Sequence, residues 1–223
     1  MFYPEKISAI KPSDKVLEIG PGSTPFDRSD LFLELAFDSE EEKVLQRGGI
    51  EKGGEFGDRP VYYYDGKEFP FCDEEFDYVI CSHVIEHVED PLFFLQEIFR
   101  VSKGAGYLEY PLIPYEYMYN FNVHLHFIKF NKLENTLLFF PKKDSTLASF
   151  YGVNALLYKT LELGWDDLCV ANKELFFEGF EYTTPFSVNK TSSVEDMLPS
   201  SELINEKKPM RMRVDRIVRK YGI

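Results

Sequence analysis

The sequence has few cysteines, no excess of positive charge and no long apolar run, and each lack excludes a class of protein. Its three cysteines, Cys72, Cys81 and Cys169, are odd in number and show no close pairing, so we expect reduced thiols in a cytoplasmic protein. No apolar run reaches the length of a membrane span, and the first residues lack the basic-then-apolar order of a secretory signal. The net charge of −13 argues against general binding of nucleic acid.

What the sequence does contain is the composition of a folded globular protein. Apolar residues make up 44% of the 223 residues, enough for one domain with a substantial core. The charge is uneven, because residues 207–223 hold seven Lys or Arg and one Asp. Apolar residues recur there at helical spacing, which predicts a basic amphipathic helix. It either docks on its own domain or touches an anionic membrane surface.

Short apolar runs followed by turn residues recur through the first half of the chain. Such runs are typical of strands buried on both faces of a parallel sheet. A segment that begins with Asp90 as N-cap and Pro91 at the first helical position predicts a crossover helix. Alternating strands and helices predict an α/β fold, a Rossmann-like open, mostly parallel sheet with flanking helices. The expected strands lie at residues 15–19, 31–35, 61–65, 76–82 and 106–110.

After Pro111 the pattern becomes irregular and rich in aromatic residues. We expect residues 1–111 to form the core and residues 112–172 to form an insertion after the fifth strand. The aromatic residues of this insertion form either a substrate pocket or lid, or a small satellite core. Residues 173–188 predict two short strands around Gly179, within a C-terminal region that covers residues 173–206.

The stretch "VLEIGPGSTPF" at residues 16–26 places backbone freedom at the end of a predicted buried strand. Ligands of open α/β sheets lie at the carboxyl ends of strands, and Gly20 and Gly22 would let the backbone approach one closely. Glu18 would stay anionic and could accept a hydrogen bond from a ligand amine. The alternative is an ordinary turn from strand to loop.

Acidic residues follow the glycine stretch on the next predicted strands. Glu34 lies inside an otherwise apolar strand, where a carboxylate costs free energy unless it has a partner, and ribose hydroxyls are a usual one. Asp38 fits the usual spacing from the glycines better but the strand pattern worse. The short interval before Glu34 predicts that the first crossover helix is abbreviated or missing. Asp65 and Gly66 end the third strand, where Asp65 could accept from an exocyclic amine.

Two further stretches, "FDYVICSHVIEHVEDP" and "GYLEYP", complete a specific pattern with these motifs. Residues 14–111 resemble the class I S-adenosylmethionine-dependent methyltransferases of the small-molecule group called type 11. The resemblance implies an enzyme that uses S-adenosylmethionine to methylate a small-molecule or glycan-type acceptor at oxygen. An inactive cofactor-binding partner or scaffold is the alternative. A dehydrogenase fits less well, since the glycine motif lacks a third glycine.

The resemblance also implies roles for single residues. Glu18 and the turn Gly20, Pro21 and Gly22 would line the methionine moiety, and Glu34 would hold the ribose. Asp65 and Gly66 would hold the adenine, with Ser82 and His83 beside the cofactor. The sequence departs from the family where Glu18 replaces the commoner Asp and where Ser23-Thr24-Pro25 replaces a third small residue. The later Arg28 and Asp30 resemble a bacterial subset of the family.

Histidine is scarce, and three of the four histidines are candidates for the base that takes the proton of a hydroxyl acceptor. His83 leaves the fourth strand on the cofactor side. His124 and His126 would share one face if their segment is a strand. His87, beside Glu86, is expected to make structural hydrogen bonds. Two histidines two residues apart can also bind a metal, but no third ligand is evident by spacing, so no metal is predicted.

Overall fold

The structure is a computed structural model that describes residues 1–37, 39, 41, 44, 56–161 and 165–198. Asp38 and the predicted basic helix at residues 207–223 lie outside the described residues. Among the helices of the described part, none is both long enough and apolar enough to cross a bilayer.

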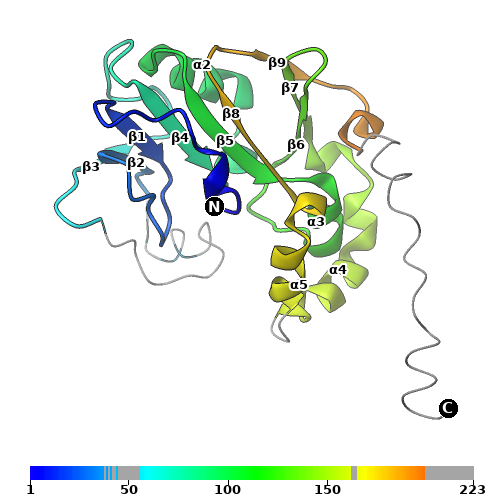
Figure 1. Ribbon diagram of the computed structural model, residues 1–223. Helices are drawn as coiled ribbons and strands as arrows, with labels where there is room; N and C mark the ends of the chain where they lie inside the picture. Colours follow the sequence, from blue (N-terminus) through cyan, green and yellow to red (C-terminus); the bar gives the residue numbers. More distant parts are fainter. Residues whose placement is uncertain (38, 40, 42–43, 45–55, 162–164, 199–223) are drawn as a thin grey trace, which may run out of the picture.

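A six-stranded sheet in the order β3-β2-β1-β4-β5-β8 forms the centre of the molecule (Figure 1). The first five strands in this order are parallel and β8 is antiparallel to β5, so the predicted open, mostly parallel Rossmann-like sheet is confirmed. The strand order reverses between β1 and β4, which is where ligands bind in such sheets. The strands are β1 (Val16–Ile19), β2 (Leu31–Leu35), β3 (Val61–Tyr64), β4 (Tyr78–Ser82), β5 (Gly106–Pro111) and β8 (Phe177–Tyr182).

Helix α2 (Pro91–Val101) is the predicted crossover from β4 to β5. It begins where expected, because the side chain of Asp90 accepts a hydrogen bond from the backbone N–H of Phe93 at 3.0 Å and Pro91 occupies the first turn. Its apolar side faces the sheet, where Leu95 and Ile98 are completely buried. Because one face of α2 is buried, its apolar residues recur at helical spacing, and the sequence therefore predicted this helix.

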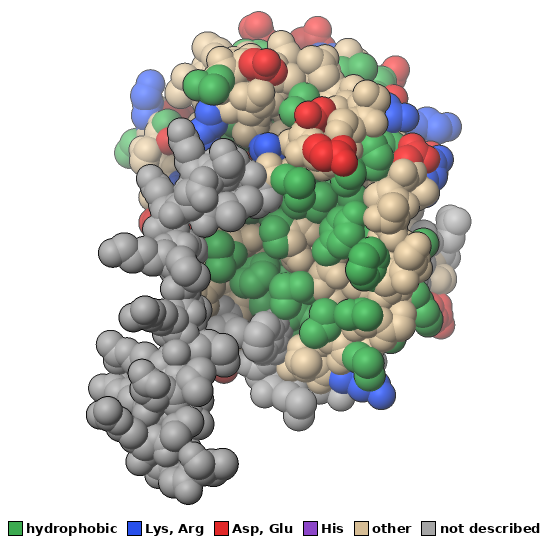
Figure 2. Space-filling model, turned by 90° about the vertical axis from the view of Figure 1, so that its right-hand side faces the viewer, with side chains coloured by type: hydrophobic (Ala, Val, Ile, Leu, Met, Phe, Trp, Pro, Cys, Tyr) green, Lys and Arg blue, Asp and Glu red, His purple; other side chains and the backbone are tan. Residues whose placement is uncertain are grey.

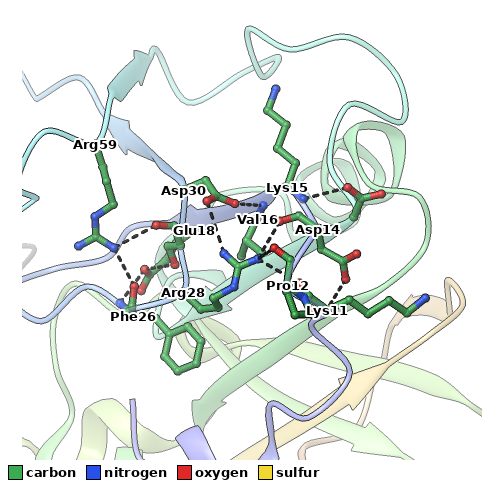
Figure 3. Close-up of polar contacts among 12 residues, drawn as sticks. Lys11, Pro12, Asp14, Lys15, Val16, Glu18, Phe26, Arg28, Asp30 and Arg59 are labelled. Atoms are coloured by element: carbon green, nitrogen blue, oxygen red, sulfur yellow. Dashed lines mark hydrogen bonds and ion pairs between the residues drawn. The ribbon is translucent and has the colours of Figure 1, made fainter.

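The connection from β1 to β2 contains no helix, which confirms the short first crossover. Side chains satisfy its backbone instead (Figure 3). Arg59 donates to the carbonyl oxygens of Phe26 and Ser29, both at 3.0 Å, and Asp30 accepts from the backbone N–H of Val16 at 2.8 Å. Arg28 fixes the segment before β1 by donating to the carbonyl oxygens of Lys11, Pro12 and Asp14. The loop is therefore held in one shape without helical hydrogen bonds.

The second half of the chain builds a second sheet beside the first and a group of helices (Figure 1). Strands β6 (His126–Asn131) and β7 (Thr136–Pro141) form an antiparallel hairpin, and β9 (Ser187–Lys190) pairs with β7 in parallel. The helices are α3 (Ile113–Tyr119), α4 (Tyr151–Tyr158) and α5 (Trp165–Ala171). Short 3-10 helices are η1 (Pro4–Lys6), η2 (Ile85–His87), η3 (Lys142–Asp144), η4 (Leu147–Phe150), η6 (Lys173–Leu175) and η7 (Val194–Met197).

The prediction of two short strands around Gly179 was wrong. Strand β8 runs through Gly179 without interruption and pairs with the whole of β5. The glycine serves packing rather than a turn, because a Cβ at this position would overlap the hydroxyl of Tyr107 and touch the ring of Tyr3 at 3.2 Å. Glycine inside a strand often marks such a close approach.

The aromatic residues of the insertion lie in two different places. Phe127 and Phe140 are buried and stack with ring centroids 6.3 Å apart in a satellite core with Ile113 and Met197. Tyr115 and Phe121 instead line a cavity described below. Apolar side chains also gather on the face drawn in Figure 2, which is the side of α4 in Figure 1. The exposed large apolar residues of η4 and α4 are Phe150, Tyr151, Val153, Leu156 and Tyr158.

Candidate active site

A cavity of about 880 Å³ lies at the carboxyl ends of β1, β2, β3 and β4. Its volume is in the upper part of the range of ligand pockets, roughly 300–1,000 Å³. We call one part the glycine end, which consists of the turn at residues 20–24 with Glu34, Asp65 and Gly66. We call the other part the histidine end, which consists of His83, Glu86, His87 and His124. The strand order thus places the predicted motifs at a single cavity.

The glycine turn depends on two residues with left-handed backbone. Gly20 has φ of +59° and Gly22 has φ of +60°, a region that side chains disfavour. The backbone N–H of Gly20 donates to the carbonyl oxygen of Leu33 at 2.9 Å, which joins the turn to β2. A Cβ on Gly20 would lie 2.5 Å from Cγ2 of Val84, whereas one on Gly22 would meet nothing within 4 Å. Gly20 is therefore required by packing, and Gly22 by conformation alone.

Glu18 lies at a different place from the one that the resemblance implied. It is buried within β1 and is not among the residues that line the cavity. Its Oε2 accepts hydrogen bonds from the backbone N–H of Phe26 at 2.9 Å and from the hydroxyl of Ser29 at 2.7 Å (Figure 3). Burial raises the pKa of Glu18, although these bonds oppose the shift. Its observed contacts fasten the loop that carries the glycine turn.

Carboxylates stand at the ends of two neighbouring strands of the glycine end. Glu34 is only 6% exposed and lines the cavity at the end of β2. Asp65 follows β3 at the rim, where its side chain is 68% exposed and lies 3.8 Å from the amine of Lys67. Gly66 turns the chain there with φ of +84°. Two acceptors at different depths therefore face one side of the cavity.

His83 lies between two buried carboxylates at the end of β4. Its Nε2 is 3.0 Å from Oε1 of Glu109, and its Nδ1 is 3.4 Å from Oε1 of Glu86. The hydroxyl of Ser82 donates to the same Glu109 oxygen at 2.9 Å, so Ser82 supports this carboxylate. Burial alone would lower the pKa of His83, but the two carboxylates outweigh it and raise the pKa to about 9. His83 is therefore protonated at neutral pH and is unsuited to accept a proton there.

His124 has a different partner. Its Nδ1 lies 2.5 Å from Oε1 of Glu116 on α3, and Oε2 of Glu116 accepts from the amine of Lys142 at 2.6 Å. The ring of His87 lies against that of His124, with centroids 4.6 Å apart. Burial lowers the pKa of His87 to about 4, so its imidazole is neutral at pH 7. The histidine end thus combines a charged imidazole with at least one neutral one.

The expectation that His124 and His126 share one strand face was wrong. Strand β6 begins only at His126, and His124 lies in the turn that follows α3. His126 is 7% exposed, packs against the ring of Phe139 at 5.4 Å and does not line the cavity. The alternation rule failed because it holds only within the strand.

Three carboxylates shape the histidine end, of which only Glu86, beside His87, was named from the sequence. Glu86, Glu109 and Glu116 are completely buried and contact the histidines described above. Glu109 could have been found, because it is a carboxylate inside an apolar strand, as Glu34 is. It accepts from the backbone N–H groups of Phe2 and Tyr3 as well, which brings the N-terminal segment to the cavity. Glu116 had no comparable signal in its irregular segment.

Comparison with known proteins finds a family model that matches the middle of the chain. Residues 36–109 match the family model described as Methyltransferase domain. An uncharacterized protein of Methanocaldococcus jannaschii is 30% identical over 110 residues, which cover 48% of this chain and 49% of that protein. The chain thus spans about half the length of the curated relative it matches. The family match begins after the glycine turn, so it is narrower than the predicted resemblance over residues 14–111.

Solved structures give weaker likenesses. A methyltransferase from Thermotoga maritima, described as S-adenosylmethionine-dependent and as a possible histamine N-methyltransferase, is 25% identical and has a TM-score of 0.32, with 49% of each chain covered. The YcgJ protein of Bacillus subtilis is 18% identical and has a TM-score of 0.37, with 53% of this chain and 57% of that chain covered. Scores this low carry no argument, so the fold is argued from the strand order alone.

Proposed function

Since residues 36–109 match the family model described as Methyltransferase domain, we propose that the chain is a class I S-adenosylmethionine-dependent methyltransferase, which binds this cofactor at the glycine end and methylates a small-molecule acceptor held at the histidine end. One observation carries the proposal. The left-handed turn at Gly20 and Gly22, the buried carboxylate of Glu34 and the end of β4 line a single cavity where the strand order reverses.

The residues of the glycine end fit the cofactor by their chemistry. Glu34 offers carboxylate oxygens to the two ribose hydroxyls, and Asp65 offers an acceptor to the adenine amine. The turn at Gly20 and Gly22 presents backbone to the methionine moiety without a side chain in the way. Glu18 acts indirectly by holding the loop after this turn. When bound, the cofactor supplies a methyl group on a sulfonium sulfur, which makes the carbon electrophilic.

We assign the acceptor to the small-molecule or glycan class, with transfer to oxygen. Apolar rings of Tyr115, Phe121 and Phe177 line the cavity and offer faces on which a sugar or a flat ring can pack. A hydroxyl acceptor must lose its proton, and His124 is the imidazole best oriented to assist, because Glu116 fixes its Nδ1 side. His83 stays cationic and so provides positive charge rather than a base. His126 has no part in the reaction, since it lies outside the cavity.

Calorimetric titration with S-adenosylmethionine, followed by transfer of a labelled methyl group to a panel of acceptors, tests this function. We expect binding at one site per chain and label on hydroxyl compounds. If only amines are labelled, transfer to oxygen is contradicted, but the proposed methyltransferase activity is supported. Binding without turnover on a wide panel would favour an inactive cofactor-binding protein, and no binding would contradict the proposed function altogether.

A further inference from the structure

Three potential metal ligands meet at the histidine end although two distant segments supply them. Glu86 and His87 belong to η2, and His124 lies before β6. One ligand atom from each lies within 4.8 Å of the others. A backbone hydrogen bond of 2.6 Å from the N–H of Leu125 to the carbonyl oxygen of Glu86 joins the two segments next to the ligands. The backbone thus holds the three side chains together.

The carboxylate of Glu86 points to a missing partner. Its side chain is completely buried, and neither carboxylate oxygen has a hydrogen bond. The nearest cationic contact is the Nδ1 of His83, 3.4 Å from Oε1, and the Nε2 of His87 is 4.0 Å from the same oxygen. Oε1 is thus paired with the imidazolium of His83, whereas Oε2 has neither a hydrogen bond nor an ion pair within the described part of the chain, and a buried carboxylate oxygen without a partner costs free energy. Glu109 shows the contrast, since four donors bond to it.

The orientation of His124 is that of a metal ligand. Its Nδ1 is held by Glu116, which leaves Nε2 as the nitrogen for another partner. A carboxylate behind a histidine, as Glu116 is here, commonly fixes the ring of metal-binding histidines. Glu116 is itself held by the amine of Lys142 at 2.6 Å. His87 adds a second imidazole to the cluster, and its ring lies against that of His124 with centroids 4.6 Å apart.

We propose that Glu86, His87 and His124 bind a divalent first-row transition-metal cation such as Zn²⁺ or Mn²⁺. One carboxylate with two imidazoles is a donor set known for catalytic zinc and for non-haem iron. Ligand atoms around a tetrahedral zinc lie about 3.4 Å apart, given bonds of about 2.1 Å, so ligand atoms that now lie within 4.8 Å of one another need to close by up to about 1.4 Å. Side-chain rotation can supply a movement of this size.

Three protein ligands leave a position open, and this position faces the cavity because all three residues line it. A hydroxyl bound there would release its proton to solvent more readily, since a metal lowers the pKa of a bound hydroxyl group. This consequence goes beyond the proposed function, because with a metal bound His124 would assist transfer to oxygen as a ligand, whereas in the metal-free chain it would act as the base itself. The metal site itself rests only on the ligands and the buried carboxylate.

Calorimetry on the full chain, made without a histidine tag and stripped with a chelator, tests the proposal with Zn²⁺ as the probe. No S-adenosylmethionine is present, so the outcome is independent of the proposed methyl transfer. We expect one site per chain, and an affinity at least about tenfold lower in Glu86→Gln and in His124→Ala. Glu116→Gln should weaken binding by about 10–100-fold through its effect on His124.

His126→Ala is the matched control, because it removes a histidine two residues away that lies outside the cluster. Its affinity should equal that of the original chain. Visible absorption of bound Co²⁺ should report a low-symmetry site in the original chain and in this control, and should be lost in His124→Ala. Circular dichroism shows whether each variant is folded. If Glu86→Gln or His124→Ala does not fold, the Zn²⁺ affinity of Glu116→Gln tests the site instead. Absence of binding, or equal binding in all variants, would overturn the site.

Discussion

The two ends of the cavity are built in different ways. The glycine end is shaped mainly by backbone, with left-handed turns at Gly20, Gly22 and Gly66 and one buried carboxylate, Glu34. The histidine end is shaped by ionisable side chains that hold one another, and its three supporting carboxylates are completely buried. The first end offers space and acceptors, and the second offers charge and proton chemistry. We therefore expect damage at the glycine end to change cofactor affinity and damage at the histidine end to change turnover, metal binding or stability.

Gly20→Val should have the largest effect on the glycine end. Its Cβ would meet Val84 at 2.5 Å, and the left-handed backbone adds roughly 1–2 kcal/mol of strain. We expect no measurable binding of S-adenosylmethionine by calorimetry, in a chain whose circular dichroism is unchanged. Gly57→Val is the control, since Gly57 has the same left-handed backbone, with φ of +61°, but is not among the residues that line the cavity, and it should retain binding. Normal affinity in folded Gly20→Val would remove this turn from the cofactor site.

His124→Ala should leave cofactor affinity nearly unchanged and reduce the rate of methyl transfer. Proton transfer assisted by a positioned side chain contributes typically about 10²–10⁴-fold, and the rate should fall by up to that factor. His126→Ala should keep the full rate, because His126 packs against Phe139 away from the cavity. Initial rates on an accepted substrate check both variants. Equal rates in the two would place proton transfer elsewhere.

In the variant His83→Asn, the free energy of unfolding should change less as the pH rises into the alkaline range. The pKa of His83 in the folded chain, about 9, lies above its ordinary value of roughly 6.5, so its contribution is present below pH 6.5 and is lost as the pH rises through 9. This contribution amounts to at most about 3 kcal/mol of the free energy of unfolding. Asparagine suits the left-handed φ of +56° at this position. Denaturant titrations at pH 6 and pH 9.5 measure the free energy of unfolding of the original chain and of His83→Asn. If both chains lose the same stability between these pH values, His83 does not carry the assigned positive charge.

Glu34→Gln should produce the smallest of these effects, a loss of roughly 1–3 kcal/mol in cofactor binding, the range for hydrogen bonds to charged groups. An amide replaces one acceptor oxygen by a donor, so it cannot accept from both ribose hydroxyls in the same way. Asp38→Asn should reduce the free energy of cofactor binding by less; Asp38 lies outside the described residues. Calorimetry on both variants ranks them. The reverse order would transfer the ribose contact to Asp38.

The difference between the two ends also explains which parts were predictable from sequence. Strands β1 to β5 and helix α2 were predicted within a few residues, because continuous apolar runs, Asp90 and Pro91 are local signals. The glycine end follows from the same strands, since their carboxyl ends meet at one edge. The strand break predicted at Gly179 was wrong because this glycine makes room for the hydroxyl of Tyr107, a contact that no local pattern reveals.

The histidine end could not be assembled from sequence for a related reason. Glu86 and His124 are far apart in the chain, and the contact between η2 and the turn before β6 brings them together. The sequence offered two histidines two residues apart, which suggested the wrong pair, because the strand begins between them. Buried ionisable residues draw their partners from any element that packs nearby, so spacing along the chain is a poor guide to them.

The most direct test of the account measures cofactor affinity and methyl-transfer rate together on Glu34→Gln and His124→Ala. We predict opposite outcomes: Glu34→Gln binds S-adenosylmethionine more weakly and recovers its rate when the cofactor is in excess, whereas His124→Ala binds normally and stays slow at any cofactor concentration. If both variants lose affinity and rate to the same extent, the two ends do not have separate roles, and the proposed division of the cavity is wrong.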